Sequence, residues 1–171
     1  MDESLLDWFN QNDIEYILHE HPAVFTVPEA KIHCGHIKGM HCKNLFLRDK
    51  KTDKFYLVTI PHDSRLDLKA FRKSIGSPKI RFGDPEDLKT ILGVSPGAVS
   101  PLSIINDKEH KAIFMVDEDV WNAPIICAHP NINTETLQLS RENFHKILEI
   151  TGHEVMVSKL PLLNSESNTE D

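Results

Sequence analysis

The chain has 171 residues, of which 40% are hydrophobic and 26% charged, and its formal net charge is −7. This balance fits one soluble globular domain, and no apolar run approaches the roughly 20 residues that cross a bilayer. The negative charge excludes broad binding to duplex nucleic acid, because such binding depends on neutralising many phosphates. It does not exclude recognition of an RNA end in one small pocket.

The predicted elements follow from capping residues, apolar periodicity and glycine stops. In chain order they are a helix from Asp2 to Phe9, a strand at Ile14–Leu18, a helix from Thr26 to Gly35, a hairpin of Asn44–Leu47 and Phe55–Ile60, a helix at Leu68–Ile75, a helix between Asp84 and Gly93, strands at Val99–Ile105, Ala112–Val116, Ile125–Ala128 and Thr136–Leu139, a helix from Ser140 to Ile150, and a strand at Glu154–Val157.

Strands outnumber helices in this order and do not alternate regularly with them. The pattern therefore predicts an α+β domain with a mixed sheet rather than a doubly wound parallel sheet. We expect one domain over residues 1–163. The polar, acidic segment 164–171 is expected to be a disordered tail.

The first residues and the cysteines of the chain indicate its compartment. Met1-Asp2-Glu3 lacks the basic and apolar pattern of a signal peptide, so a cytoplasmic protein is expected. Cys34, Cys42 and Cys127 are odd in number and have no paired spacing, which predicts free thiols.

A ligand-rich stretch raises the alternative of a small metal-binding protein. Its five candidate ligands are His33, Cys34, His36, His41 and Cys42. A tetrahedral zinc site usually draws paired ligands from two places, and no matching second half follows here. The metal site remains an alternative hypothesis.

Cys127 and His129 are two residues apart, so both would face the same side of a strand. A cysteine nucleophile would need such a histidine nearby. The commoner role of a buried free cysteine is that of a small apolar side chain, and we favour it here.

Three further positions suggest a site, each with a simpler interpretation. Gly97 follows Pro96 in a loop that favours a turn with positive φ, which either aims backbone groups into a pocket or only connects two elements. Lys43 is polar where a strand becomes apolar, which is also usual at a solvated strand edge. His129 follows an apolar strand, where a rigid sheet positions catalytic groups, or where a histidine merely caps the strand end.

Four segments in this order resemble a known family. They are His21–Ala30, Cys42–Leu47, Gly93–Leu102, and His129-Pro130-Asn131 with Thr134. Together they are similar to the YbaK and prolyl-tRNA synthetase editing-domain superfamily, most of all to freestanding alanyl-tRNA(Pro) deacylases. The resemblance covers about residues 5–160.

The resemblance implies a compact α+β domain around a mixed, barrel-like sheet flanked by helices. It also implies hydrolysis of the ester between a wrongly attached amino acid and tRNA, with no metal or organic cofactor. Its lysine and histidine match Lys43 and His129 as catalytic residues. The implied substrate contacts are Asn44, Gly97, Ala98 and Ser100.

The implied partner is the aminoacylated 3′ end of mischarged tRNA, most of all Ala-tRNA(Pro). Prolyl-tRNA synthetase or an elongation factor is a candidate protein partner. Two alternatives stay open beside the metal site: removal of cysteine or another small amino acid from tRNA, and a binding module for the aminoacyl end without turnover.

Overall fold

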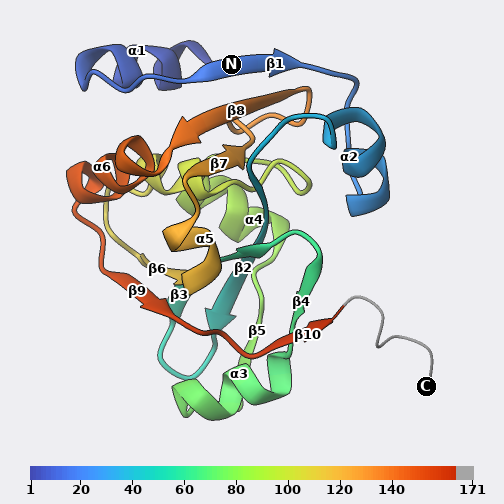
Figure 1. Ribbon diagram of the computed structural model, residues 1–171. Coiled ribbons are helices and arrows are strands. Elements are labelled where there is room, and N and C mark those ends of the chain that lie inside the picture. Colours follow the sequence, from blue (N-terminus) through green and yellow to red (C-terminus); the bar gives the residue numbers. More distant parts are fainter. Residues whose placement is uncertain (165–171) are drawn as a thin grey trace.

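Strand β2 (Met40–Asp49) runs through the middle of the molecule and joins the two halves of a large mixed sheet (Figure 1). The structure is a computed structural model that describes residues 1–164. Across the sheet the strands follow the order β1 (Ile17–Glu20), β8 (Glu135–Ser140), β7 (Ile125–Ala128), β2, β3 (Lys54–Pro61), β6 (Ala112–Asp117) and β9 (Val155–Ser158).

The predicted α+β class and mixed sheet are confirmed. Three pairs are parallel, namely β2 with β7, β3 with β6, and β6 with β9. The other neighbours on this path are antiparallel. Among residues 1–164 the end strands β1 and β9 do not pair with each other, so the sheet is open and is not a closed barrel.

Three short strands lie outside this path. Strand β5 (Ile80–Phe82) pairs with the second half of β2, while β4 (Ser64–Leu66) and β10 (Leu162–Asn164) form a separate two-stranded sheet. Because β10 includes Asn164, the first residue of the predicted tail belongs to a strand. The rest of that tail, 165–171, lies outside the described residues.

The helices begin and end largely at the predicted capping residues. They are α1 (Glu3–Gln11), α2 (Val27–Cys34), α3 (Leu68–Ile75), α4 (Pro85–Asp87), the π-helical turn η1 (Leu88–Leu92), the 3-10 helix η2 (Pro101–Asn106), α5 (Glu118–Asn122) and α6 (Arg141–Thr151). Within residues 1–164 no helix combines the length and apolar character needed to span a membrane.

The centre of the sheet is buried on both faces, and strand β3 shows how the sequence achieves this. Phe55 and Leu57 pack on one face with Phe114 and Phe144. Tyr56, Val58 and Ile60 alternate with them and pack on the other face with Phe71 of α3. A continuous apolar strand is typical of a sheet covered on both sides.

The predicted strand at Val99–Ile105 is wrong, because this segment contains helix η2. Ser100 caps the helix: its hydroxyl accepts from Leu102 N–H, and its own N–H donates to the Ser103 hydroxyl. Pro101 suits the first helical position, where its missing N–H costs nothing. The apolar run that suggested a strand belongs to a helix buried on all sides, from Pro101 to Ile105.

Candidate active site

A cavity opens where two parallel strands separate. The last residue pair between β2 and β7 is His41 with Cys127. Strand β7 ends at Ala128, whereas β2 continues through Cys42 and Lys43 beside β3. The gap beyond this point forms a cavity of about 430 Å³. The cavity therefore lies at the carboxyl end of β7 and beside the first residues of β2, where the chain after β7 leaves the sheet.

The cavity brings together four of the six predicted site residues. Lys43, Asn44, Gly97 and His129 all contribute to its lining. The other lining residues are Val24, Phe25, Thr26, Val27, Ala30, Lys31, Cys34, Gly35, His41, Cys42, His62, Val99, Cys127, Ala128 and Thr136.

Ala98 and Ser100 do not line this cavity, so their predicted substrate contacts are not supported by the geometry. Ser100 is fully buried and its hydroxyl is engaged in capping η2. Ala98 packs against the main hydrophobic core, and its N–H donates to the Ser95 carbonyl. Both residues shape the loop that presents Gly97.

Backbone hydrogen bonds join the two segments that frame the cavity. His21 N–H donates to the Thr134 carbonyl at 3.0 Å. Val24 N–H donates to the Asn133 carbonyl at 3.2 Å, and the Asn133 side chain donates back to the Val24 carbonyl at 3.1 Å. These contacts explain why the segment after β1 and the segment after β7 contribute to one site.

The His129 ring is held in one orientation with one nitrogen free. Its Nδ1–H donates to the Glu135 carbonyl at 2.8 Å. Because a carbonyl only accepts, this bond places the proton of the neutral ring on Nδ1 and leaves a lone pair on Nε2. Nε2 has no hydrogen-bond partner within the described part of the chain. Burial lowers the pKa of His129 below its ordinary value of 6.5, so the ring is neutral at pH 7.

Asn44 is oriented by a residue on the neighbouring strand. The hydroxyl of Thr59, a fully buried residue, donates to the Asn44 side-chain oxygen at 2.7 Å. Since this oxygen is engaged, the amide NH₂ group is the part of Asn44 that remains for a ligand. The pair Asn44–Thr59 lies directly across β2 and β3.

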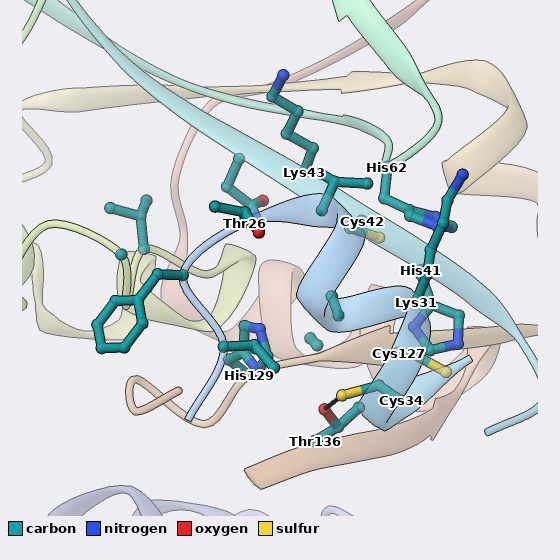
Figure 2. Close-up of a pocket in the computed structure, with 18 of the residues that line it drawn as sticks. Thr26, Lys31, Cys34, His41, Cys42, Lys43, His62, Cys127, His129 and Thr136 are labelled. Carbon is teal, nitrogen blue, oxygen red and sulfur yellow. Dashed lines mark hydrogen bonds between the residues drawn. The ribbon is translucent and has the colours of Figure 1, made fainter. Parts of the chain in front are cut away.

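Lys43 lines the wall of the cavity but its ammonium group is directed outward. In Figure 2 the side chain extends away from His129, so the ammonium and the imidazole lie on opposite sides of the site. Within residues 1–164 Lys43 forms no ion pair, unlike Lys31, which pairs with Asp63 at 2.7 Å. The cation is therefore free to meet an anionic group at the cavity mouth.

Gly97 has the predicted positive φ, at +89°. A side chain at this position would adopt a strained backbone conformation, and its Cβ would lie 3.5 Å from the Phe25 ring. Glycine thus leaves its peptide groups accessible at the rim of the cavity.

All three cysteines line the cavity, and none is a suitable nucleophile. Burial raises the pKa of Cys127 to about 12 and also raises the pKa of Cys34 and of Cys42. At pH 7 these groups are thiols, whereas the thiolate is the reactive form. Cys127 and His129 share a side as the two-residue spacing predicts, but Cys127 serves as a small apolar wall.

The alternative metal site is not assembled. Among residues 1–164 no group of three or more histidine, cysteine or carboxylate side chains is placed to hold a metal ion. The His41 ring nitrogen Nε2 instead contacts the Ile37 carbonyl at 2.7 Å. Cys34 lies near Thr136, whose hydroxyl is 3.9 Å from its sulfur.

Sequence reasoning missed several residues that line the cavity. His62 follows β3, and its N–H donates to the His41 carbonyl, which places the two rings 5.5 Å apart (Figure 2). The Thr136 hydroxyl also contacts Nε2 of His21 at 2.9 Å. The strand end before His62 was a usable signal, whereas Thr136 lies within an ordinary strand pattern.

Comparison with solved structures places this arrangement in a known class of fold. A protein proposed as a trans-editing enzyme for prolyl tRNA synthetase superposes with a TM-score of 0.68 at 21% identity. The match covers 94% of this chain and 98% of that one. At this identity the likeness establishes the fold, an α+β domain with a large mixed sheet.

Sequence comparison then identifies the family. The model of the aminoacyl-tRNA editing domain matches residues 21–147. Prolyl-tRNA editing protein ProX of Acetoanaerobium sticklandii is 36% identical over 82% of this chain and 85% of its own length. Prolyl-tRNA synthetase associated domain-containing protein 1 of Mus musculus is 37% identical over 81% and 83%, respectively. The chain belongs to the aminoacyl-tRNA editing domain family, as its four ordered segments indicated.

Proposed function

We propose that this protein is a trans-editing hydrolase of the cytoplasm that cleaves the ester joining a wrongly attached amino acid to tRNA, with Ala-tRNA(Pro) as its substrate. The observation that carries the proposal is the single cavity lined by Lys43, Asn44, Gly97 and His129. The family match and the names of two relatives, a prolyl-tRNA editing protein and a prolyl-tRNA synthetase associated protein, support this substrate class.

His129 supplies the acceptor that ester hydrolysis requires. Its unprotonated Nε2 accepts a hydrogen bond from the attacking water or from the neighbouring ribose hydroxyl. The bond from Nδ1–H to Glu135 keeps the ring in the tautomer that makes this role available. No cysteine nucleophile is needed, since the substrate contains its own adjacent hydroxyl.

Negative charge develops on the ester carbonyl oxygen, and neutral donors at the cavity stabilise it. The Asn44 amide, aimed by Thr59, and the peptide groups around Gly97 are the candidate donors. Lys43 has a different role in this proposal. Its outward ammonium binds the phosphate of the terminal nucleotide as a compact positive charge.

The choice of alanine rests on the family resemblance, with apolar and small side chains around the cavity in support. Val24, Ala30 and Ala128 are among the lining residues. One methylene changes binding by only about 1–3 kcal/mol in an apolar pocket, so cysteine is the competing substrate amino acid. Prolyl-tRNA synthetase is the candidate protein partner that would deliver the mischarged tRNA.

The test is release of alanine from Ala-tRNA(Pro) by the purified protein, beside Cys-tRNA(Pro), Pro-tRNA(Pro) and Ala-tRNA(Ala). We expect rapid release from the first substrate and loss of release in His129→Ala. Preference for Cys-tRNA(Pro) would replace alanine with cysteine as the target. Stoichiometric binding with no release from any of these tRNAs would refute the enzyme and indicate a binding module.

A further inference from the structure

Phe25 is an aromatic residue at the cavity that the proposed chemistry does not use. It contributes to the lining, yet 69% of its surface is exposed. Its ring belongs to none of the hydrophobic core clusters formed by the described residues. Phe82 is similarly exposed at 60% but does not line the cavity. Position, and not exposure alone, therefore distinguishes Phe25.

The backbone of Phe25 is fixed on both sides. Its N–H donates to the Glu29 carboxylate at 2.8 Å, and the next residue, Thr26, caps helix α2. The preceding residue, Val24, is buried and exchanges two hydrogen bonds with Asn133. Because this backbone is already ordered, only the two side-chain torsions of Phe25 remain to be fixed when a ligand arrives, which limits the entropic cost of binding.

The Phe25 ring lies close to the glycine turn at Gly97. Its Cδ1 atom lies 3.5 Å from the position that a Cβ on Gly97 would occupy. The ring edge thus rests beside the glycine turn, while most of the side chain remains uncovered. The combination is an exposed aromatic ring on an ordered backbone at the cavity.

The chemistry of the proposed substrate supplies an occupant for this surface. The ribose that carries the aminoacyl ester also carries the terminal nucleobase, so a base must lie within one sugar of the cavity that takes the ester. A protein with a net charge of −7 does not neutralise a long run of phosphates, so contacts close to the cavity must supply much of the affinity. Stacking between a base and an aromatic ring adds affinity that does not depend on net charge.

We propose that Phe25 stacks on the terminal nucleobase of the aminoacylated RNA and is a positioning residue of the site. This inference rests on the proposed function. Ile32 on helix α2 is more exposed than Phe25 but does not line the cavity, so we assign it no such role.

The experiment uses an RNA hairpin that ends in a stable amide-linked alanine and carries fluorescent 2-aminopurine as its terminal base. Stacking on an aromatic ring quenches this fluorophore, which gives a readout independent of hydrolysis. We expect Phe25→Ala to abolish the quenching and weaken binding about tenfold, within the usual range for one stacked base. Phe25→Trp should preserve both signals, and Phe25→Leu should behave like the alanine variant because it lacks a π-face.

Phe82→Ala is the matched control, since it removes a similarly exposed ring that does not line the cavity and should change neither signal. Unchanged quenching and affinity in Phe25→Ala, with the parent protein binding normally, would overturn the stacking contact alone. Retained affinity in Phe25→Leu would assign a general apolar contact instead and overturn stacking. No binding of this RNA by the parent protein would overturn the inference together with the proposed function.

Discussion

His129 donates its Nδ1–H to the carbonyl oxygen of Glu135 at 2.8 Å, and this contact decides which ring nitrogen faces the ligand. Glu135 is the first residue of β8, so the orientation of the imidazole is set by the strand after the loop. A histidine positioned in this way is neutral and accepts a proton at Nε2. Burial supports the same state by disfavouring the charged ring.

Deacylation should therefore lose activity in acid as His129 becomes protonated. Because the pKa of His129 in the folded protein lies below 6.5, the active neutral form is present above that pKa and disappears as the pH falls through it. We expect kcat/KM to decline on the acid side of pH 6.5, measured over pH 4.5–8. His129→Asn should lower the rate at pH 7 about 100-fold and remove this acid limb. If kcat/KM of His129→Asn still declines in acid as in the parent protein, the decline is due to another titrating group.

Thr59→Val tests whether Asn44 must be oriented. The variant loses the 2.7 Å hydrogen bond to the Asn44 oxygen while keeping the size of the buried side chain. We expect a roughly tenfold lower kcat with little change in KM, and a loss of about 1 kcal/mol in the free energy of unfolding in urea. Thr59→Ser restores the hydroxyl and should recover most of kcat. Equal kcat for the valine and serine variants would contradict the role given to Asn44.

Lys43→Ala should weaken substrate binding more than catalysis, because its ammonium extends away from His129. We expect a higher KM, and a salt dependence of binding whose log–log slope is smaller by about 1, as one phosphate contact is lost. Lys73→Ala, an exposed lysine on α3, is the control. A loss confined to kcat with an unchanged salt slope would place Lys43 at the reacting ester instead.

Gly97→Ala and Gly76→Ala separate backbone strain from function. Both glycines have positive φ, +89° and +75°, and neither added Cβ meets an atom closer than 3.5 Å. Each variant should therefore lose about 1 kcal/mol of stability through the same backbone cost. Only Gly97→Ala should also reduce deacylation, since Gly76 ends α3 and does not line the cavity. Equal activity in the two variants would show that the Gly97 turn does not contact the substrate.

Cys127→Ala should retain activity within a few-fold of the parent. The pKa of Cys127 is raised to about 12 by burial, so the group remains a thiol and does not attack the ester. Alkylation by iodoacetamide at pH 8 should accordingly be slow in the folded protein and fast in urea. If Cys127→Ala folds stably but loses activity a thousandfold or more, Cys127 acts as a nucleophile.

Local sequence determined the helix ends, the class of fold and the conformation of the key turn. Asp2, Thr26 and Ser140 cap helices as their side chains suggest, and Gly97 adopts the predicted positive φ. These features depend on hydrogen bonds and steric limits within a few residues, so the signals are contained in short segments. The order of four such segments also sufficed to indicate the family.

The tertiary structure decided how those segments form a site. The apolar run after Ser100 became a buried helix, because packing on every side overrides the pattern that predicted a strand. His62 and Thr136 reach the cavity only through the pairing of β2 with β3 and of β7 with β8. Pairing between strands far apart in the chain depends on the whole core, and no local pattern specifies where two strands separate.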